Sequence, residues 1–264
     1  MKDIFDQDVI TLREEDHVYQ LHTAPHLRFT SATTFIHQFF SDFNAKEVAE
    51  NLVANNAKYA GKSAKQLVKS WKKFGDTGTF VHKELEDWLI AFREMKTLPE
   101  VTNQKSKHGV YWLEENLEDY YIPYPEMRVY SVKYQIAGTI DILLYNPKTD
   151  EWLILDWKTN KALYDRGFKG KKGTHAATAK LEDCNLVHYS LQLSLYQYLL
   201  EVEYGIRIKA RVLLHLRPNA TPYYPLGVKE YWTDYLKYDI ERMLKHRLQQ
   251  KEDGALFDLE LNDN

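Results

Sequence analysis

Two aspartates and a lysine stand close together in a stretch of the sequence that predicts two neighbouring strands. Asp141 lies in one apolar run, and Asp156 and Lys158 lie in the next. Because side chains alternate along a strand, Asp156 and Lys158 share one face while Trp157 points to the other. A carboxylate and an ammonium on an otherwise apolar strand are costly to bury alone, so this face needs charged partners or a metal ion.

These residue types suit the hydrolysis of phosphodiester bonds. Two carboxylates, here Asp141 and Asp156, can hold Mg²⁺, which prefers hard oxygen ligands. The metal polarises the phosphate and lowers the pKa of a bound water molecule. Lys158 is expected to orient that water, and the backbone carbonyl of Trp157 is placed to serve as a further oxygen ligand. The alternative for this set is a structural ion pair.

This stretch resembles the PD-(D/E)XK nucleases, in particular their RecB-type and phage-exonuclease branch, and it is similar to the mitochondrial genome maintenance exonucleases. The matching segments are GTID at 138–141 and DWKTNK at 156–161. GTID stands for the PD element, with Ile140 in the place of the proline, and DWKTNK carries the D-X-K element. The resemblance implies that the two aspartates and the lysine are the catalytic residues.

A helical segment upstream strengthens this match. GTFVHKELE at 78–86 resembles the branch's G-x-x-x-H-x-x-x-E helix, and the resemblance makes His82 a metal ligand. Glu86 follows one helical turn later on the same face and is expected to support the site. Glu126 precedes the first core strand, where the family often has a glutamate near the site. The alternatives are a buried histidine that caps a carbonyl for His82 and an ordinary surface position for Glu86.

A second helical segment lies downstream of the D-X-K element. QLSLY at 192–196 resembles the branch's Q-x-x-x-Y motif, whose two polar residues lie one turn apart on a shared helix face. The resemblance implies that Gln192 and Tyr196 shape the site and hold DNA. Packing alone is the alternative for both residues.

A basic, glycine-containing segment directly follows the D-X-K strand. Residues 157–180 contain seven Lys or Arg and one acid, Asp165, and the glycines among them predict a mobile loop. A mobile basic loop beside a phosphate-cleaving site indicates a clamp on the nucleic-acid backbone. The DNA contacts expected here are Lys161, Lys169, Lys171 and Lys172. A solvated surface loop is the alternative.

A framework of strands and helices must bring these residues together. Strands are predicted at 126–134, 136–146, 151–159 and 207–216. Helices are predicted at 79–95, 185–204 and 229–250, with loops at 75–78 and 96–110. Strands joined by tight turns pair antiparallel, and a strand reached through a helix pairs parallel. The expected fold is therefore α/β, with a restriction-endonuclease-like αβββαβ core, a central mixed sheet and flanking helices.

The chain divides into three parts. Residues 1–75 form a mostly helical region packed on the core, which begins with two short strands around a turn at Ala24-Pro25. Residues 76–250 hold the nuclease core and its C-terminal helix. Residues 251–264 carry five acids against one lysine, which predicts a flexible tail.

The composition limits the settings in which this chain can work. The formal net charge is −3, so positive charge for a nucleic acid must be local. Cys184 is the one cysteine, which excludes an internal disulfide and an iron–sulfur cluster held by this chain's cysteines. No run approaches 18 apolar residues, so no membrane contact is expected. A reducing cytoplasm, bacterial or phage-infected, is the natural expectation.

The motifs together predict a Mg²⁺-dependent nuclease, with Mn²⁺ as a substitute, that hydrolyses DNA. An exonuclease acting on ends or single strands in replication, recombination or repair is expected, with a helicase or a recombination or replication protein as partner. The alternative is a catalytically inactive nuclease fold that only binds nucleic acid, and a restriction-like endonuclease is a third option. The complete ligand set with Lys158 favours the enzyme. DNA and RNA, single and double strands, and one or two metal ions are all compatible with the motifs.

Overall fold

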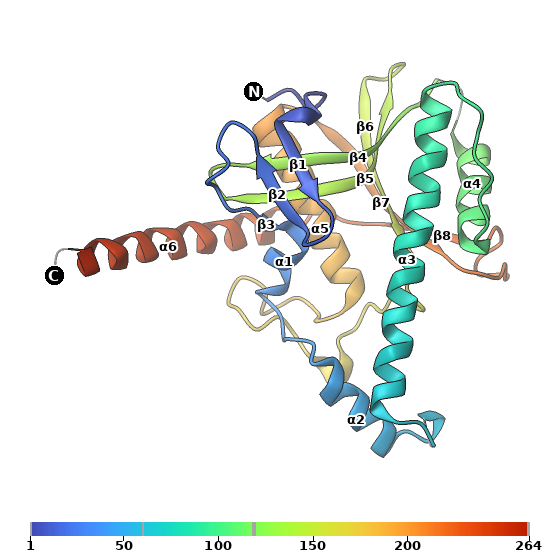
Figure 1. The fold of residues 1–264 in the computed structure, drawn as a ribbon, viewed down its shortest axis with the longest axis horizontal. Helices are drawn as coiled ribbons and strands as arrows, with labels where there is room; N and C mark the ends of the chain where they lie inside the picture. Colours follow the sequence, from blue (N-terminus) through green and yellow to red (C-terminus); the bar gives the residue numbers. More distant parts are fainter. Residues whose placement is uncertain (1, 60, 118–119, 263–264) are drawn as a thin grey trace.

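A mixed six-stranded sheet forms the centre of the computed structural model, which describes residues 2–59, 61–117 and 120–262 (Figure 1). Its strands are β3 (Thr30–Ser31), β4 (Ile122–Ser131), β5 (Ile136–Asn146), β6 (Glu151–Lys158), β7 (Ile208–Leu216) and β8 (Val228–Trp232). β4, β5 and β6 pair antiparallel in succession, and β6 pairs parallel with β7. β8 returns antiparallel on β7, and the short β3 runs parallel to β5.

Helices cover both faces of this sheet. They are α1 (Ala32–His37), α2 (Ala45–Asn55), α3 (Ala64–Arg93), α4 (Gln104–Asn116), α5 (Asn185–Leu199) and α6 (Lys237–Asn262). α3 and α4 pack on one face, where Leu85 and Leu155 belong to one buried cluster. α1, α5 and α6 pack on the other, where Phe35 and Leu191 belong to a second cluster. The order α3-α4-β4-β5-β6-α5-β7 confirms the predicted restriction-endonuclease-like α/β core, with α4 as an additional helix.

The N-terminal strands lie earlier in the chain than predicted. β1 (Ile10–Arg13) and β2 (Val18–Leu21) form a separate hairpin, and the predicted turn at Ala24-Pro25 comes after both. The Tyr19 hydroxyl lies 2.9 Å from Thr139 Oγ1 and so joins this hairpin to β5. The remaining short helices are η1 (Gln7–Val9), η2 (Ala57–Tyr59), η3 (Phe168–Gly170) and the π-helical turn η4 (Leu200–Tyr204).

α3 is one continuous helix of 30 residues, whereas the sequence predicted a loop at Gly75–Gly78. Each glycine inside a helix costs about 1 kcal/mol relative to alanine, which is why the pattern indicates a break. A capping box between Ser63 and Gln66 fixes the start of the helix. A Cβ on Gly78 would lie 2.8 Å from Thr159 Oγ1. The glycine therefore lets α3 approach the end of β6, and packing outweighs the local preference.

Helix α4 begins inside the predicted loop 96–110. Its first turn is capped by the Asn103 side chain, which accepts a hydrogen bond from the Lys105 N–H. The Glu84 carboxylate of α3 also accepts hydrogen bonds from the N–H groups of Thr102 and Asn103. Because a residue 18 and 19 positions earlier in the chain accepts these two hydrogen bonds, local sequence could not indicate where α4 starts.

Strand boundaries also differ at β4 and β8. β4 covers 122–131 rather than 126–134 and tolerates Pro123 and Pro125 because it pairs with β5 alone. β8 occupies the first residues of the predicted helix 229–250, since its backbone pairs with β7. A five-residue strand is too short to stand out in the sequence beside a long helical pattern.

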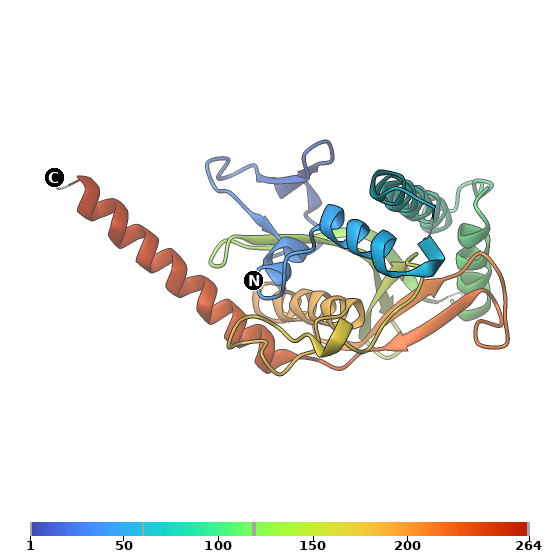
Figure 2. The same ribbon diagram turned by 90° about the horizontal axis from the view of Figure 1, so that it is seen from below.

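The C-terminal helix runs past its predicted end at residue 250. α6 continues to Asn262, through most of the segment predicted as a separate tail. Figure 2 shows α6 leaving the body of the molecule as a long helix. In the part of the chain that the structure describes, no helix is long and apolar enough to cross a membrane.

Candidate active site

The ladder between β5 and β6 ends at the two predicted catalytic aspartates. Its last backbone pair is Ile142 with Leu155, and the next positions along the two strands are Asp141 and Asp156. Beyond this point β5 continues beside β4 and reaches β3, while β6 continues beside β7. The Asp141 carboxylate replaces the missing backbone partner, because its Oδ2 accepts a hydrogen bond from the Trp157 N–H at 2.9 Å. We call this point of divergence the β5–β6 fork.

α3 brings His82 to the β5–β6 fork. The imidazole Nδ1 lies 3.3 Å from Asp141 Oδ2. His82 follows Gly78 by one helical turn, and the close approach of Gly78 to Thr159 sets how near α3 comes to β6. The predicted helix motif and both predicted strand motifs therefore meet at one place.

Asp156 and Lys158 form an ion pair at the buried side of the fork. Asp156 is 1% exposed, and Lys158 Nζ contacts its Oδ2. That oxygen nevertheless accepts no well-directed hydrogen bond from any residue that the structure describes. Burial raises the pKa of Asp156 to about 6, although the charge of Lys158 opposes this. Burial would lower the pKa of Lys158, but the charges of Asp156 and Asp141 outweigh it and raise the pKa, so the ammonium stays charged.

Tyr189 of α5 holds Lys158 in place and was missed by the sequence reasoning. Lys158 Nζ lies 4.3 Å from the centre of the Tyr189 ring, and the Tyr189 hydroxyl donates to Asn160 Oδ1 at 3.0 Å. Tyr189 stands three residues before Gln192 and so shares its helix face. This spacing is the sequence feature by which Tyr189 could have been found. It gives no indication that Tyr189 contacts Lys158.

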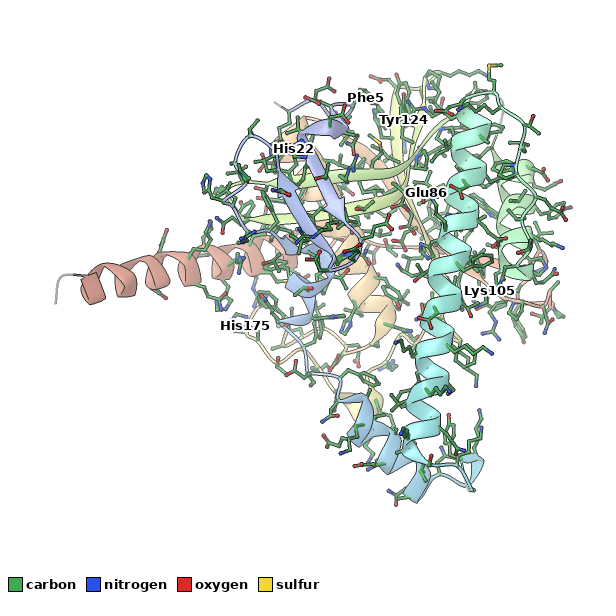
Figure 3. All side chains as sticks on the ribbon, viewed as in Figure 1. Phe5, His22, Glu86, Lys105, Tyr124 and His175 are labelled. Atoms are coloured by element: carbon green, nitrogen blue, oxygen red, sulfur yellow. The ribbon has the colours of Figure 1, made fainter. Side chains whose placement is uncertain are left out.

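The two glutamates that were predicted to support the site lie on β4 and α3. Glu126 falls opposite Asp141 in the β4–β5 register and has a φ of 51°, which is uncommon for a residue with a side chain. Burial raises the pKa of Glu126 to about 9, and the negative charges of Asp141 and Glu86 add to this. Glu86 lies on the side of α3 that faces the strands and pairs with Lys83 at 3.1 Å (Figure 3). The fork thus concentrates negative charge.

Gln192 and Tyr196 lie together on α5, behind β5. Gln192 Nε2 donates to the Tyr196 hydroxyl at 3.0 Å. The Tyr196 ring packs so tightly against Gly138 that a Cβ there would lie 2.5 Å from Tyr196 Cε1. Tyr196 is 3% exposed, so it supports β5 from within the core and does not offer the surface that a direct DNA contact would need. Its packing nevertheless fits the predicted role in shaping the site.

The basic loop after β6, whose glycines predicted mobility, makes contacts within itself. The Glu182 carboxylate accepts a hydrogen bond from the Gly167 N–H at 2.9 Å and pairs with Lys172 Nζ. Lys169 and Lys171 are exposed, and neither pairs with an acidic side chain among the described residues. Of these three predicted DNA contacts, two are therefore available to an external anion and Lys172 is engaged internally.

The donors at the fork suit a hard divalent cation. Among the described residues, no three His, Cys, Asp or Glu side chains are arranged as a ready metal site. The carboxylates of Asp141 and Asp156 nevertheless supply oxygen donors, and His82 supplies a nitrogen. The buried Asp156 oxygen without a directed hydrogen bond and the raised pKa of Glu126 both indicate surplus negative charge. A cation would offset that charge, so these residues, with the Trp157 carbonyl, fit the predicted metal site.

Comparison with known proteins agrees with this geometry. A sequence profile of the PD-(D/E)XK nuclease superfamily matches residues 18–255. The chain therefore belongs to the PD-(D/E)XK nuclease superfamily, whose nucleases generally use divalent metal ions such as Mg²⁺. No curated protein matches the chain significantly.

Proposed function

We propose that this chain is a divalent-metal-dependent nuclease that hydrolyses DNA, and that it acts as an exonuclease on ends or single strands. The observation that carries the proposal is the meeting of His82, Asp141, Asp156 and Lys158 at the β5–β6 fork. These residues come from three separate motifs, and the fork is the kind of place where strands part and side chains can converge on a ligand. A degenerate binding module would have no chemical need for all four.

The residues of this chain have separable roles in the proposed reaction. Asp141, Asp156, His82 and the Trp157 carbonyl would hold Mg²⁺ or Mn²⁺, which when bound polarises the phosphate and activates water. The Lys158 ammonium, held by the Tyr189 ring, donates hydrogen bonds towards the reacting phosphate and offsets its growing negative charge. Glu126 supports the fork from β4; burial raises its pKa and the charges of Asp141 and Glu86 add to this, and a cation bound beside it would lower that pKa again.

The loop after β6 supports a nucleic-acid substrate with accessible bases. Lys169 and Lys171 are exposed in the loop after β6, and Tyr164 and Phe168 of the same loop are 64% and 73% exposed. Lysines among exposed aromatic rings suit a single strand, because each base offers a face for stacking. We further propose that the nuclease acts in the cytoplasm in replication, recombination or repair, with a helicase or recombination protein as its partner.

The test is cleavage of end-labelled single- and double-stranded DNA with Mg²⁺, with Mn²⁺ and with EDTA. Wild type should cut with either metal and be inert in EDTA. Asp156→Asn and Lys158→Met should each lower the cleavage rate at least a thousandfold and keep the fold, judged by circular dichroism. Asp8→Asn is the charge-matched control, because Asp8 is exposed in η1 and outside the site.

The pattern of products decides between the readings. Progressive release of the label from one end supports the exonuclease and shows its polarity. Cleavage by Asp156→Asn at the wild-type rate would remove the site assignment. DNA that is retarded but uncut under every metal would favour the alternative of a catalytically inactive module that binds nucleic acid.

A further inference from the structure

Four basic side chains from separate segments gather beside the end of β6. They are Lys58 of η2, Lys105 in the first turn of α4, Lys161 in the loop after β6 and Arg217 directly after β7. Lys105 Nζ donates to the Thr159 carbonyl at 2.6 Å, and an Arg217 N–H donates to the Lys161 carbonyl. These bonds fix the cluster to the stretch of backbone that leaves the active site. We call these four residues the β6-end basic cluster.

The cluster holds like charges together. Contact with Lys58 and its positive charge lower the pKa of Lys161. Burial lowers the pKa of Lys105, and the charge of Arg217 adds to this. Within the described ranges, no acidic side chain forms an ion pair with any member of the cluster. The repulsion is therefore uncompensated inside the protein, and an anion among these groups would relieve it.

The position of Lys105 adds a second, independent cost. Lys105 lies in the first turn of α4, next to α3, and this turn contains no acidic residue (Figure 3). The partial positive charge at a helix N-terminus favours anions and disfavours a lysine. The Glu84 carboxylate at this helix end offsets part of that charge, so the repulsion among the four cations is the main cost that an anion would relieve.

Lys105 and Arg217 also have hydrogen-bond donors beyond those used in the bonds described above. An ammonium offers three N–H donors and a guanidinium five, and the bonds described use one each on Lys105 and Arg217. Lys161 follows Lys158 by three residues, so the two α-carbons are at most about 10 Å apart.

We propose that the β6-end basic cluster binds a phosphate group of the nucleic acid close to the bond that is cleaved. Its location relative to a cleaved bond rests on the proposed nuclease function, whereas anion binding itself does not. The phosphate can be an internal phosphodiester or a terminal phosphate monoester. The monoester carries more charge and more free oxygens, so a cluster of four cations suits it better.

The test measures binding without cleavage. Fluorescence anisotropy in EDTA would compare single-stranded oligonucleotides that end in 5′-phosphate, 3′-phosphate or hydroxyl groups. The test variant is the double substitution Lys58→Gln and Lys161→Gln, which leaves the Lys161 carbonyl in place for Arg217. The control is Lys133→Gln with Lys245→Gln, which removes the same charge from two exposed positions.

The expected result is a loss of about tenfold in affinity for the test variant and a salt dependence shallower by about 0.7, the value for one phosphate contact on a single strand. If the ligand is a terminal monoester, wild type prefers one phosphorylated end and the variant loses that preference. If it is internal, all three oligonucleotides weaken equally.

A test variant that matches the control in affinity and salt dependence would overturn the phosphate site. Because the assay contains no metal, that result would leave the nuclease proposal standing. Conversely, a chain that shows this binding and never cuts DNA would refute the nuclease proposal alone.

Discussion

The contact between Gly138 and Tyr196 offers a sharp test of how the core positions the active site. Gly138 is buried in β5, three residues before Asp141, and the Tyr196 ring fills the space where a side chain would begin. A Cβ there would lie 2.5 Å from Cε1 and 3.0 Å from the hydroxyl oxygen of Tyr196. Real Cβ atoms do not approach other atoms so closely, so Gly138→Ala must move either the ring or the strand.

The expected cost follows from two opposing effects. Overpacking a filled core costs about 1–3 kcal/mol. Replacing glycine with alanine restricts the unfolded chain, which returns about 0.4–1 kcal/mol. The net loss in the free energy of unfolding is therefore about 1–2 kcal/mol for Gly138→Ala, and the Tm should fall by about 2–8 °C. Because Asp141 is on the same strand, a shift of about 1 Å would lower the cleavage rate by up to about a hundredfold.

A second glycine gives the matched control. Gly75 lies on the exposed side of α3, and a Cβ there would meet nothing within 4 Å. Gly75→Ala should therefore stabilise the protein by about 1 kcal/mol through helix propensity and leave cleavage unchanged. Thermal unfolding and end-labelled DNA cleavage, measured on both variants, separate a packing effect from a general effect of an added methyl group.

Two results would refute the packing argument. The first is a Gly138→Ala protein as stable and as active as wild type. The second comes from the double variant Gly138→Ala with Tyr196→Leu, which removes the ring edge that the new methyl group meets. If the ring is the obstacle, the loss from Gly138→Ala should be smaller in the Tyr196→Leu background, and an equal loss in both backgrounds would show that it is not.

Three further predictions concern charge and metal binding. Glu126 has a folded-state pKa of about 9, which is above its unfolded value, so unfolding releases its proton and the free energy of unfolding should fall as pH rises towards 9. Thermal unfolding in EDTA should show a weaker dependence of stability on pH for Glu126→Gln than for wild type. Glu84→Ala should cost about 1–3 kcal/mol at pH 7, because the carboxylate caps α4 through Thr102, Asn103 and Ser106. Hydrogen bonds lower the pKa of Glu84 despite burial, so this difference in unfolding free energy should shrink as pH falls through the acid range. Mg²⁺ at a hundred times its Kd should stabilise wild type by about 2.7 kcal/mol in calorimetry. Asp156→Asn should remove most of that gain, and an equal gain in the variant would contradict the assigned ligand.

The residues that we propose to be catalytic could be singled out from the sequence because charged side chains are unusual on an otherwise apolar strand. Asp156 and Lys158 interrupt an apolar strand, and the order of motifs around them matched a known α/β core. His82 needed that resemblance as well, since a single histidine on a helix has several ordinary roles. The structure brings all of these residues to the fork through contacts that the strand and helix patterns already implied.

The features that the sequence could not predict depend on contacts between distant residues. α3 runs through two glycines because Gly78 meets Thr159, which is 81 positions away in the chain. α4 starts where Glu84 supplies a cap from another helix. In the loop after β6, Glu182 joins residues that lie 10 and 15 positions before it. In both helices local propensity indicated one structure and tertiary contacts stabilised another.

The fork itself explains why two aspartates can sit on adjacent strands of a sheet. If the β5–β6 ladder continued, Asp141 and Asp156 would be direct neighbours with like charges, which is unfavourable. The strands part at this pair, the Asp141 carboxylate satisfies the Trp157 N–H, and Lys158 offsets the charge of Asp156. Each local cost is thereby reduced without removing the negative charge that a divalent cation needs. The same divergence lets the chain after β6 turn towards Lys105 and Arg217, which places the active site and the β6-end basic cluster along one continuous stretch of backbone.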